Sequence, residues 1–116
     1  MTYTGLVQDL DITPKMAKVL KVFLEDPDQE RYGFELMKLT GMASGSLYPM
    51  LARLEEAGWL TRGREIIDPH AAGRPPRMNY TITGAAVTAA RLQLAALSDQ
   101  YRPPAAGRLR AQGSTT

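Results

Sequence analysis

The chain is 116 residues long and 44% hydrophobic, which suits one domain with a modest core, and no apolar run approaches the roughly 18 to 20 residues of a membrane span. It has no cysteine and a single histidine, His70, which excludes disulfides and thiolate or multi-histidine metal sites. The N-terminus lacks a secretion signal, so we expect a cytoplasmic protein without a cofactor.

The net charge of +2 is unevenly spread: residues 1–35 hold four basic and seven acidic side chains (net −3), and residues 36–116 hold ten basic and five acidic ones (net +5). A basic second half fits a nucleic-acid face, although a solvated surface is the commoner meaning of such a charge run.

Two helices are predicted in the first part of the chain, after an N-terminal arm (residues 1–12) without clear periodicity. Thr13 is a suitable N-cap before a proline, and apolar residues then recur at helical spacing, which predicts a helix over residues 14–25. A short helix over residues 34–40 follows and ends at Gly41, which suits a left-handed cap.

A third helix begins after only a short turn, and this pair of helices has the layout of a helix-turn-helix, whose second helix enters the major groove of DNA. Its apolar residues repeat at steps of three and four and predict one buried stripe, formed by Leu47, Met50, Leu51 and Leu54. The opposite side carries polar groups and a proline, and we expect this side to read DNA; it comprises Ser46, Pro49, Arg53 and Glu56.

Pro49 limits where the third helix can start, because proline is tolerated in the first turn and costs about 3 kcal/mol in a helix interior. Ser46 as N-cap would place Pro49 in that first turn, whereas Ser44 as N-cap would forfeit one backbone hydrogen bond. The pattern does not choose between the two serines. In either case the helix start offers free N–H groups and hydroxyls that suit phosphate oxygens.

The following segment changes to the period of strands. Residues 61–67 and 77–82 are predicted to form a hairpin, and the loop over residues 68–76 contains three prolines that no strand can accommodate. This loop and its end carry Arg74 and Arg77, so the hairpin has a basic tip.

A last helix is predicted over residues 84–101, and a basic tail of residues 102–116 is expected to be disordered. The helix has an apolar stripe that a small domain would not leave exposed, and we expect it to form a homodimer interface. The stripe consists of Val87, Ala90, Leu94, Leu97 and Tyr101.

The predicted fold is therefore mainly α with a small β-hairpin: a winged helix-turn-helix over residues 13–83 with an added C-terminal dimerisation helix. Three blocks carry a resemblance to the PadR family of bacterial transcriptional regulators, and they lie in the expected order and spacing. They are residues 32–36 (YGFEL), 45–58 (GSLYPMLARLEEAG) and 73–77 (GRPPR), with Tyr80 and Ile82 following. The resemblance covers about residues 12–97.

This resemblance implies a homodimeric repressor without enzymatic activity, whose third helix enters the major groove and whose wing touches the DNA backbone or minor groove. By position, the helix contacts to double-stranded DNA would be Ser44, Ser46, Tyr48 and Pro49, and the wing contacts would be Arg74 and Arg77. Arg53 is added because its side chain faces the groove and could reach a guanine edge. A homodimer also predicts an inverted-repeat operator.

Several alternatives remain open at this point. Tyr48 could be a half-buried aromatic residue at the edge of the core, and Trp59 is interpreted as a core residue instead of a stacking platform for a ligand. A winged-helix protein-protein interaction module is the alternative to a DNA-binding repressor. A small-molecule effector would need a site of about 300 Å³ at a dimer interface lined by Met16, Phe23 and the last helix, and we expect no dedicated pocket there.

Overall fold

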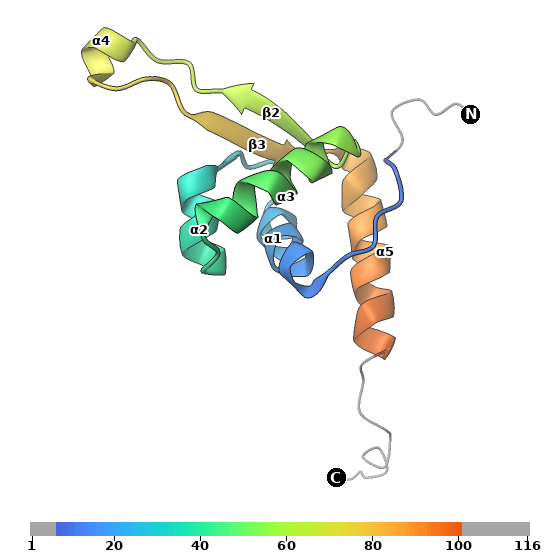
Figure 1. The fold of residues 1–116 in the computed structure, drawn as a ribbon. Coiled ribbons are helices and arrows are strands. Elements are labelled where there is room, and N and C mark those ends of the chain that lie inside the picture. The colour runs from blue at the N-terminus through green and yellow to red at the C-terminus, as the bar shows by residue number, and fades with distance from the viewer. Residues whose placement is uncertain (1–6, 101–116) are drawn as a thin grey trace, which may run out of the picture.

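A computed structural model describes residues 7–100 and shows a helical body from which an antiparallel sheet extends (Figure 1). In chain order the elements are α1 (Pro14–Glu25), β1 (Arg31–Tyr32), α2 (Gly33–Thr40), α3 (Ser44–Glu56), β2 (Leu60–Arg64), α4 (Pro69–Ala72), β3 (Met78–Ile82) and α5 (Gly84–Gln100). Among the described residues, no helix is long and apolar enough to cross a membrane. The mainly helical fold with a small antiparallel sheet is the predicted one.

The sheet has three strands in the order β1-β3-β2, one more than the sequence predicted. Strands β2 and β3 form the predicted hairpin, with Leu60 opposite Ile82 and Arg64 opposite Met78. Strand β1 adds to the other edge of β3 through residues 31–32. A strand of this length is too short to show an alternating pattern, so only the tertiary pairing reveals it.

The hairpin ladder is shorter than predicted, because β2 ends at Arg64 and residues 65–67 leave it. The loop that follows contains the single-turn helix α4. Asp68 is its N-cap, because Asp68 Oδ1 accepts from the backbone N–H of His70 at 3.0 Å. Gly73 ends this turn with a φ of 71°, in the left-handed region that glycine adopts without steric cost.

The start of α3 differs from both predicted alternatives. Ala43 is the N-cap residue, and its carbonyl accepts from the backbone N–H groups of Ser46 at 3.1 Å and Leu47 at 2.9 Å. Neither predicted serine is the cap, and Pro49 lies inside the helix. Since Pro49 has no N–H, the carbonyl of Gly45 lacks its usual helical donor, and this is tolerated because both residues are exposed to water.

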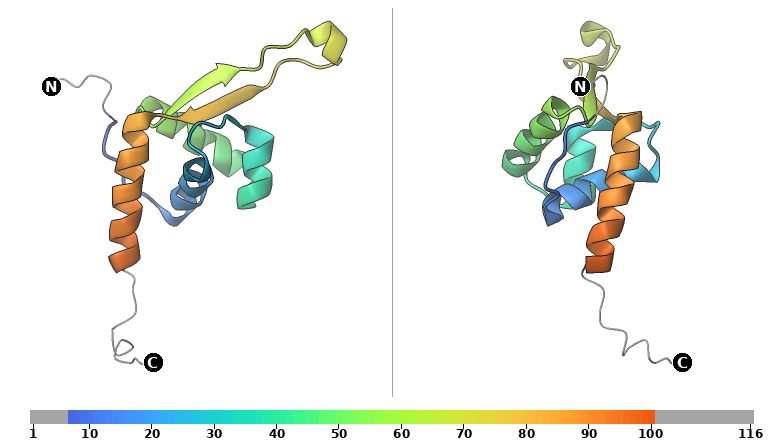
Figure 2. Two further views of the ribbon diagram at one scale, coloured as in Figure 1. Left: turned by 180° about the vertical axis from the view of Figure 1, so that it is seen from behind. Right: turned by 90° about the vertical axis from the view of Figure 1, so that its right-hand side faces the viewer.

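The core lies between α1, α2, α3, the sheet and the first half of α5. Its largest fully buried side chains are Trp59, Phe23, Met16, Leu20, Leu36, Leu47, Leu51, Leu54, Leu60 and Val19. The wing, which consists of strands β2 and β3 and the loop over residues 65–77, leaves this body on the side away from α5 (Figure 2). Two sides of the molecule are thereby separated, one carrying α5 and the other carrying the wing.

Trp59 is a core residue, as interpreted from the sequence, and it joins three segments that are distant in sequence. Its indole N–H donates to the carbonyl of Gln8 in the arm at 2.7 Å. Its backbone N–H donates to Leu54 in α3 at 2.8 Å, and its carbonyl accepts from Thr83, directly before α5, at 3.0 Å. A single fully buried residue therefore fixes the end of α3, the arm and the start of α5.

The apolar stripe of α5 divides into two halves. Ala90 is buried in the core of its own chain and Val87 packs against it, whereas Leu94 and Leu97 are only half-buried. Tyr101 lies outside the described residues, as do the first half of the arm (residues 1–6) and the predicted tail. The first half of the stripe thus serves the fold of the single chain.

Trp59→Phe tests the contact between the arm and the core. The substitution keeps an aromatic ring but removes the donor to Gln8, and a lost buried hydrogen bond costs about 1–2 kcal/mol of unfolding free energy. Urea denaturation followed by circular dichroism should show this loss, and His70→Ala, on the exposed loop, should leave the midpoint unchanged. An unchanged midpoint for Trp59→Phe would show that the indole N–H contributes nothing.

Candidate nucleic-acid interface

Helix α3 separates an apolar face from an exposed polar face, as predicted. The fully buried positions are Leu47, Leu51 and Leu54, with Met50 half-buried beside them. The exposed positions include Ser44, Ser46, Pro49 and Arg53. The predicted contact residues of this helix are therefore accessible, and Tyr48 is accessible only in part.

Tyr48 is partly exposed, at 43%, and its ring packs across the start of α2. A Cβ atom built on Gly33 would lie 2.7 Å from Tyr48 Cε1 and would overlap the phenol ring. Only glycine at position 33 allows α3 and α2 to approach in this way. Tyr48 thus combines both interpretations of the sequence: an aromatic residue at the edge of the core with an accessible edge.

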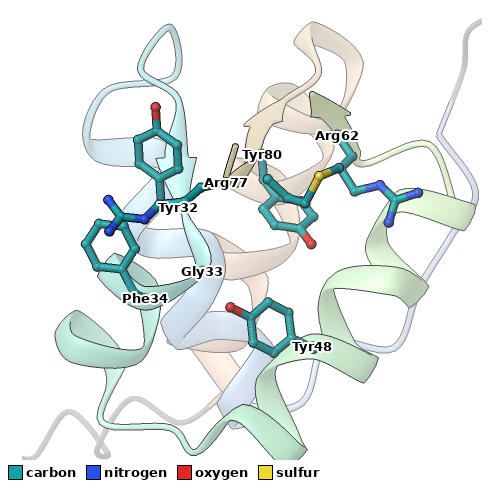
Figure 3. Close-up of a pocket in the computed structure, with 8 residues that line it drawn as sticks. Tyr32, Gly33, Phe34, Tyr48, Arg62, Arg77 and Tyr80 are labelled. Atoms are coloured by element: carbon teal, nitrogen blue, oxygen red, sulfur yellow. The ribbon is translucent and has the colours of Figure 1, made fainter. Parts of the chain in front are cut away.

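A groove of about 500 Å³ lies between α3, the start of α2 and the base of the wing (Figure 3). It is lined by Tyr32, Gly33, Phe34, Tyr48, Arg62, Arg77, Met78 and Tyr80. Figure 3 shows Tyr48 and Tyr80 projecting into it from opposite sides. Burial raises the pKa of Tyr80, and Arg62 partly opposes this effect, so the phenol keeps its proton and can donate a hydrogen bond.

One wall of this groove is an aromatic stack capped by an arginine. The rings of Tyr32 and Phe34 are stacked with centroids 5.7 Å apart and an interplanar angle of 19°. The guanidinium of Arg77 lies 4.8 Å from the centroid of the Phe34 ring, a cation–π contact. The contact directs Arg77 back toward α2 and holds a positive charge at the edge of the groove.

The base of the wing loop is held by Glu65. Its carboxylate accepts two hydrogen bonds from the guanidinium of Arg74, at 2.7 and 3.0 Å, and one from the backbone N–H of Arg77 at 3.2 Å. Hydrogen bonding from Arg74, opposed in part by desolvation, lowers the pKa of Glu65 to about 2. The folded-state pKa lies below the usual carboxyl value, so Glu65 remains ionised at neutral pH and its pairing weakens only when the pH falls toward 2.

The arginines of this surface differ in how far their charge is neutralised. Arg74 is paired with Glu65, and Arg62 lies 3.6 Å from Glu55. Within residues 7–98, no ion pair engages the exposed guanidinium groups of Arg53, Arg64 and Arg77.

Arg31 is a buried arginine that links α2 to α1 beside the groove, and the sequence did not single it out. Only 7% exposed, it donates to Glu35 at 2.9 Å and to the carbonyl of Val22 at 3.4 Å. Glu35 also accepts from the backbone N–H of Tyr32 at 3.2 Å and thereby caps α2. This network fixes the aromatic wall of the groove relative to α1.

Three of the residues that shape the site were not predicted, namely Gly33, Glu65 and Arg31. An acidic residue flanked by wing arginines is a signal that could have indicated Glu65, whereas nothing local marks Gly33 as the partner of Tyr48. Among the described residues, no cluster of three or more potential metal ligands is found.

Comparison with known proteins gives a family match and two solved structures. The family model of the transcriptional regulator PadR-like family matches residues 19–88, more than half of the chain. No functionally curated protein shows significant sequence similarity. The crystal structure of smu.1704 from Streptococcus mutans UA159 resembles the fold over 92% of this chain and 98% of that chain, with a TM-score of 0.60 and 16% identity. A possible transcriptional regulator from Methanosarcina mazei Go1 aligns over 71% of this chain and 69% of that chain, with a TM-score of 0.49 and 21% identity.

Gly33→Ala tests the close approach of α2 and Tyr48. The added methyl group must displace the ring, and overpacking of this kind costs about 1–3 kcal/mol of unfolding free energy. Gly45→Ala is the matched control, because a Cβ there meets nothing within 4 Å and should be neutral or slightly stabilising in a helix. Thermal unfolding of both variants, and of Gly33→Ala combined with Tyr48→Ala, measures the effect. If Gly33→Ala unfolds like the control, or if removing the Tyr48 ring restores no stability, the contact does not constrain the helices.

Proposed function

This chain belongs to the PadR-like family of DNA-binding transcriptional regulators, which are not enzymes, and we propose that it acts as a repressor that binds an inverted-repeat operator as a homodimer. The observation that carries the proposal is that Tyr48 of α3 and the wing-base arginines Arg62 and Arg77 line one groove, and that α3 also carries exposed polar residues. A major-groove helix flanked by a basic hairpin is the arrangement by which winged helices bind duplex DNA.

Recognition is divided between α3 and the wing in this proposal. On α3, the first turn contributes Ser44 and Ser46, the accessible edge of Tyr48 and the exposed Pro49 follow, and Arg53 lies furthest along the helix. Arg53 is exposed and free of ion pairs among the described residues, so it is the side chain suited to a guanine edge.

On the wing, Arg74 and Arg77 were both expected to touch DNA. Their different surroundings support different electrostatic contributions to DNA binding. Arg77 presents an unpaired charge beside Phe34, which suits a phosphate. Arg74 shares its charge with Glu65 and has a side chain only 31% exposed. We therefore assign the larger electrostatic contribution to Arg77.

The second half of α5 supports the homodimer. Leu94 and Leu97, with Ile12, Pro14, Ala17, Lys21 and Ser98, line an open groove of about 470 Å³ between α1 and α5. From the sequence we expected too little volume for a small-molecule effector. This groove exceeds the volume of about 300 Å³ that an effector would need, so size alone does not argue against one. We propose that the second protomer covers the groove, because it continues the stripe that the first half of α5 buries in its own core.

Two recognition helices related by a twofold axis would enter successive major grooves about 34 Å apart. The operator is accordingly an inverted repeat with half-sites one helical turn, or a multiple of it, apart. Selection from randomised duplexes followed by sequencing would identify it, and recovery of no enriched symmetric sequence would favour a protein-protein interaction module instead.

Leu94→Glu tests the dimer interface. A carboxylate in the apolar groove between α1 and α5 would have to be desolvated on association, so the variant should sediment as a monomer at micromolar concentration. Leu92→Glu is the matched control, since Leu92 is 68% exposed and lies outside the groove, and it should remain dimeric. A wild-type protein that is already monomeric at this concentration contradicts the proposal.

Arg53→Ala and Arg77→Ala test the division of DNA recognition. Loss of a guanine contact should reduce the preference for the selected operator over a random duplex by about 1–3 kcal/mol. Loss of a phosphate contact should weaken both duplexes alike and flatten the slope of log affinity against log salt by about 0.9 per contact. Fluorescence anisotropy over a salt series measures both effects. Equal behaviour of the two variants would show that helix and wing do not have separate roles.

A further inference from the structure

The loop of the wing is held by hydrogen bonds from its backbone and side chains that all involve Glu65. Residues 65–77 leave the ladder at Arg64 and return to it at Met78, and the backbone N–H of Glu65 donates to the carbonyl of Arg77 at 2.8 Å across the base of the loop. The Glu65 carboxylate then accepts from the guanidinium of Arg74 and from the backbone N–H of Arg77. Glu65, at the start of the loop, therefore binds both Arg74 and Arg77 near its end.

The position of these contacts gives Glu65 an effect on Arg77 in particular. The carboxylate fixes the backbone of Arg77 from one side, while the Phe34 ring holds its guanidinium 4.8 Å from the centroid on the other. Arg74 uses its guanidinium on Glu65 and on the carbonyl of Pro75 at 3.3 Å, which leaves it little capacity for a phosphate. The fork of Arg74 is thus engaged within the wing and its charge is largely compensated.

We propose that Glu65 and Arg74 are positioning residues of the wing, which set the orientation of Arg77 for phosphate binding, and that Arg74 is not itself a principal DNA contact. The inference rests on the proposed function and goes beyond it, because it assigns a role in DNA affinity to an acidic residue. This ion pair lies in a surface loop outside the core and adds little to the stability of the whole fold, so the effect is expected in the geometry of the wing and in DNA binding.

The sign of the effect of Glu65→Ala separates this proposal from simple electrostatics. Removing a carboxylate from a DNA-facing surface should raise the affinity for a polyanion if charge alone mattered. If Glu65 positions the wing, the same change lowers affinity although the protein becomes more positive. Glu30→Ala is the matched control, because Glu30 is exposed, lines the same side of the wing base as Glu65 and makes no ion pair within the described residues.

Arg74→Lys gives a second, independent distinction. Lysine keeps the charge but cannot supply the two parallel hydrogen bonds of the guanidinium. A direct phosphate contact by Arg74 would survive this change in large part, whereas a positioning role would be lost as fully as in Arg74→Ala.

The experiment measures binding of the full-length protein to a random-sequence duplex over a salt series, together with thermal unfolding of each variant. We expect Glu65→Ala, Arg74→Lys and Arg74→Ala to bind about threefold or more weakly with unfolding temperatures near that of the wild type, and Glu30→Ala to bind as tightly or more tightly. The salt slope of Glu65→Ala should fall toward that of Arg77→Ala, and the double variant of Glu65 and Arg77 should show no further decrease.

Tighter or unchanged binding by Glu65→Ala, or wild-type binding by Arg74→Lys beside weak binding by Arg74→Ala, overturns the inference. If Arg77→Ala weakens binding in the same series, the proposed function stands and only the role of Glu65 is rejected. A wild-type protein that shows no salt-dependent binding to the duplex rejects the proposed function itself.

Discussion

The burial of Trp59 is the constraint on which the arrangement of the recognition surface depends. An indole ring this large is stable in a core only when its N–H has a partner, and here the arm supplies the carbonyl of Gln8. Trp59 lies in the short connection between α3 and β2, so its burial and its hydrogen bond to Leu54 hold the end of α3 next to the start of the wing. The hydrogen bond from Thr83 ties Trp59 to the start of α5, so the side that carries α5 and the side that carries the wing share one anchor.

Around this anchor, the arginines of the chain are divided between structural and accessible roles. Arg31 is buried and pairs with Glu35, and Arg74 pairs with Glu65. Arg53 on α3 and Arg77 at the edge of the groove are exposed, and neither makes an ion pair among the described residues. A count of basic residues in the sequence therefore overestimates the charge available to DNA, because pairing with carboxylates compensates part of it.

Much of the fold was predictable because its signals are local. The N-cap at Thr13, the left-handed cap at Gly41 and the apolar spacing of α1, α2 and α5 gave helix limits within a residue or so of those observed. The start of α3 was not predictable, because the cap is the backbone of Ala43 and an exposed helix tolerates the missing hydrogen bond at Pro49. Strand β1 was missed because two residues contain no period.

The sequence by itself determined the order and type of the main elements, the buried stripe of α3 and the family that the chain resembles. Each of these depends on residues near one another in the chain. Only the tertiary structure decided that Tyr48 packs on Gly33 and that Arg74 is bound to Glu65. These pairs lie on different elements, and local spacing holds no information about which side chains meet when the elements pack. The predicted contact residues are therefore a set of candidates, and only packing reveals that Arg74 is paired with Glu65 whereas Arg77 lies over the Phe34 ring.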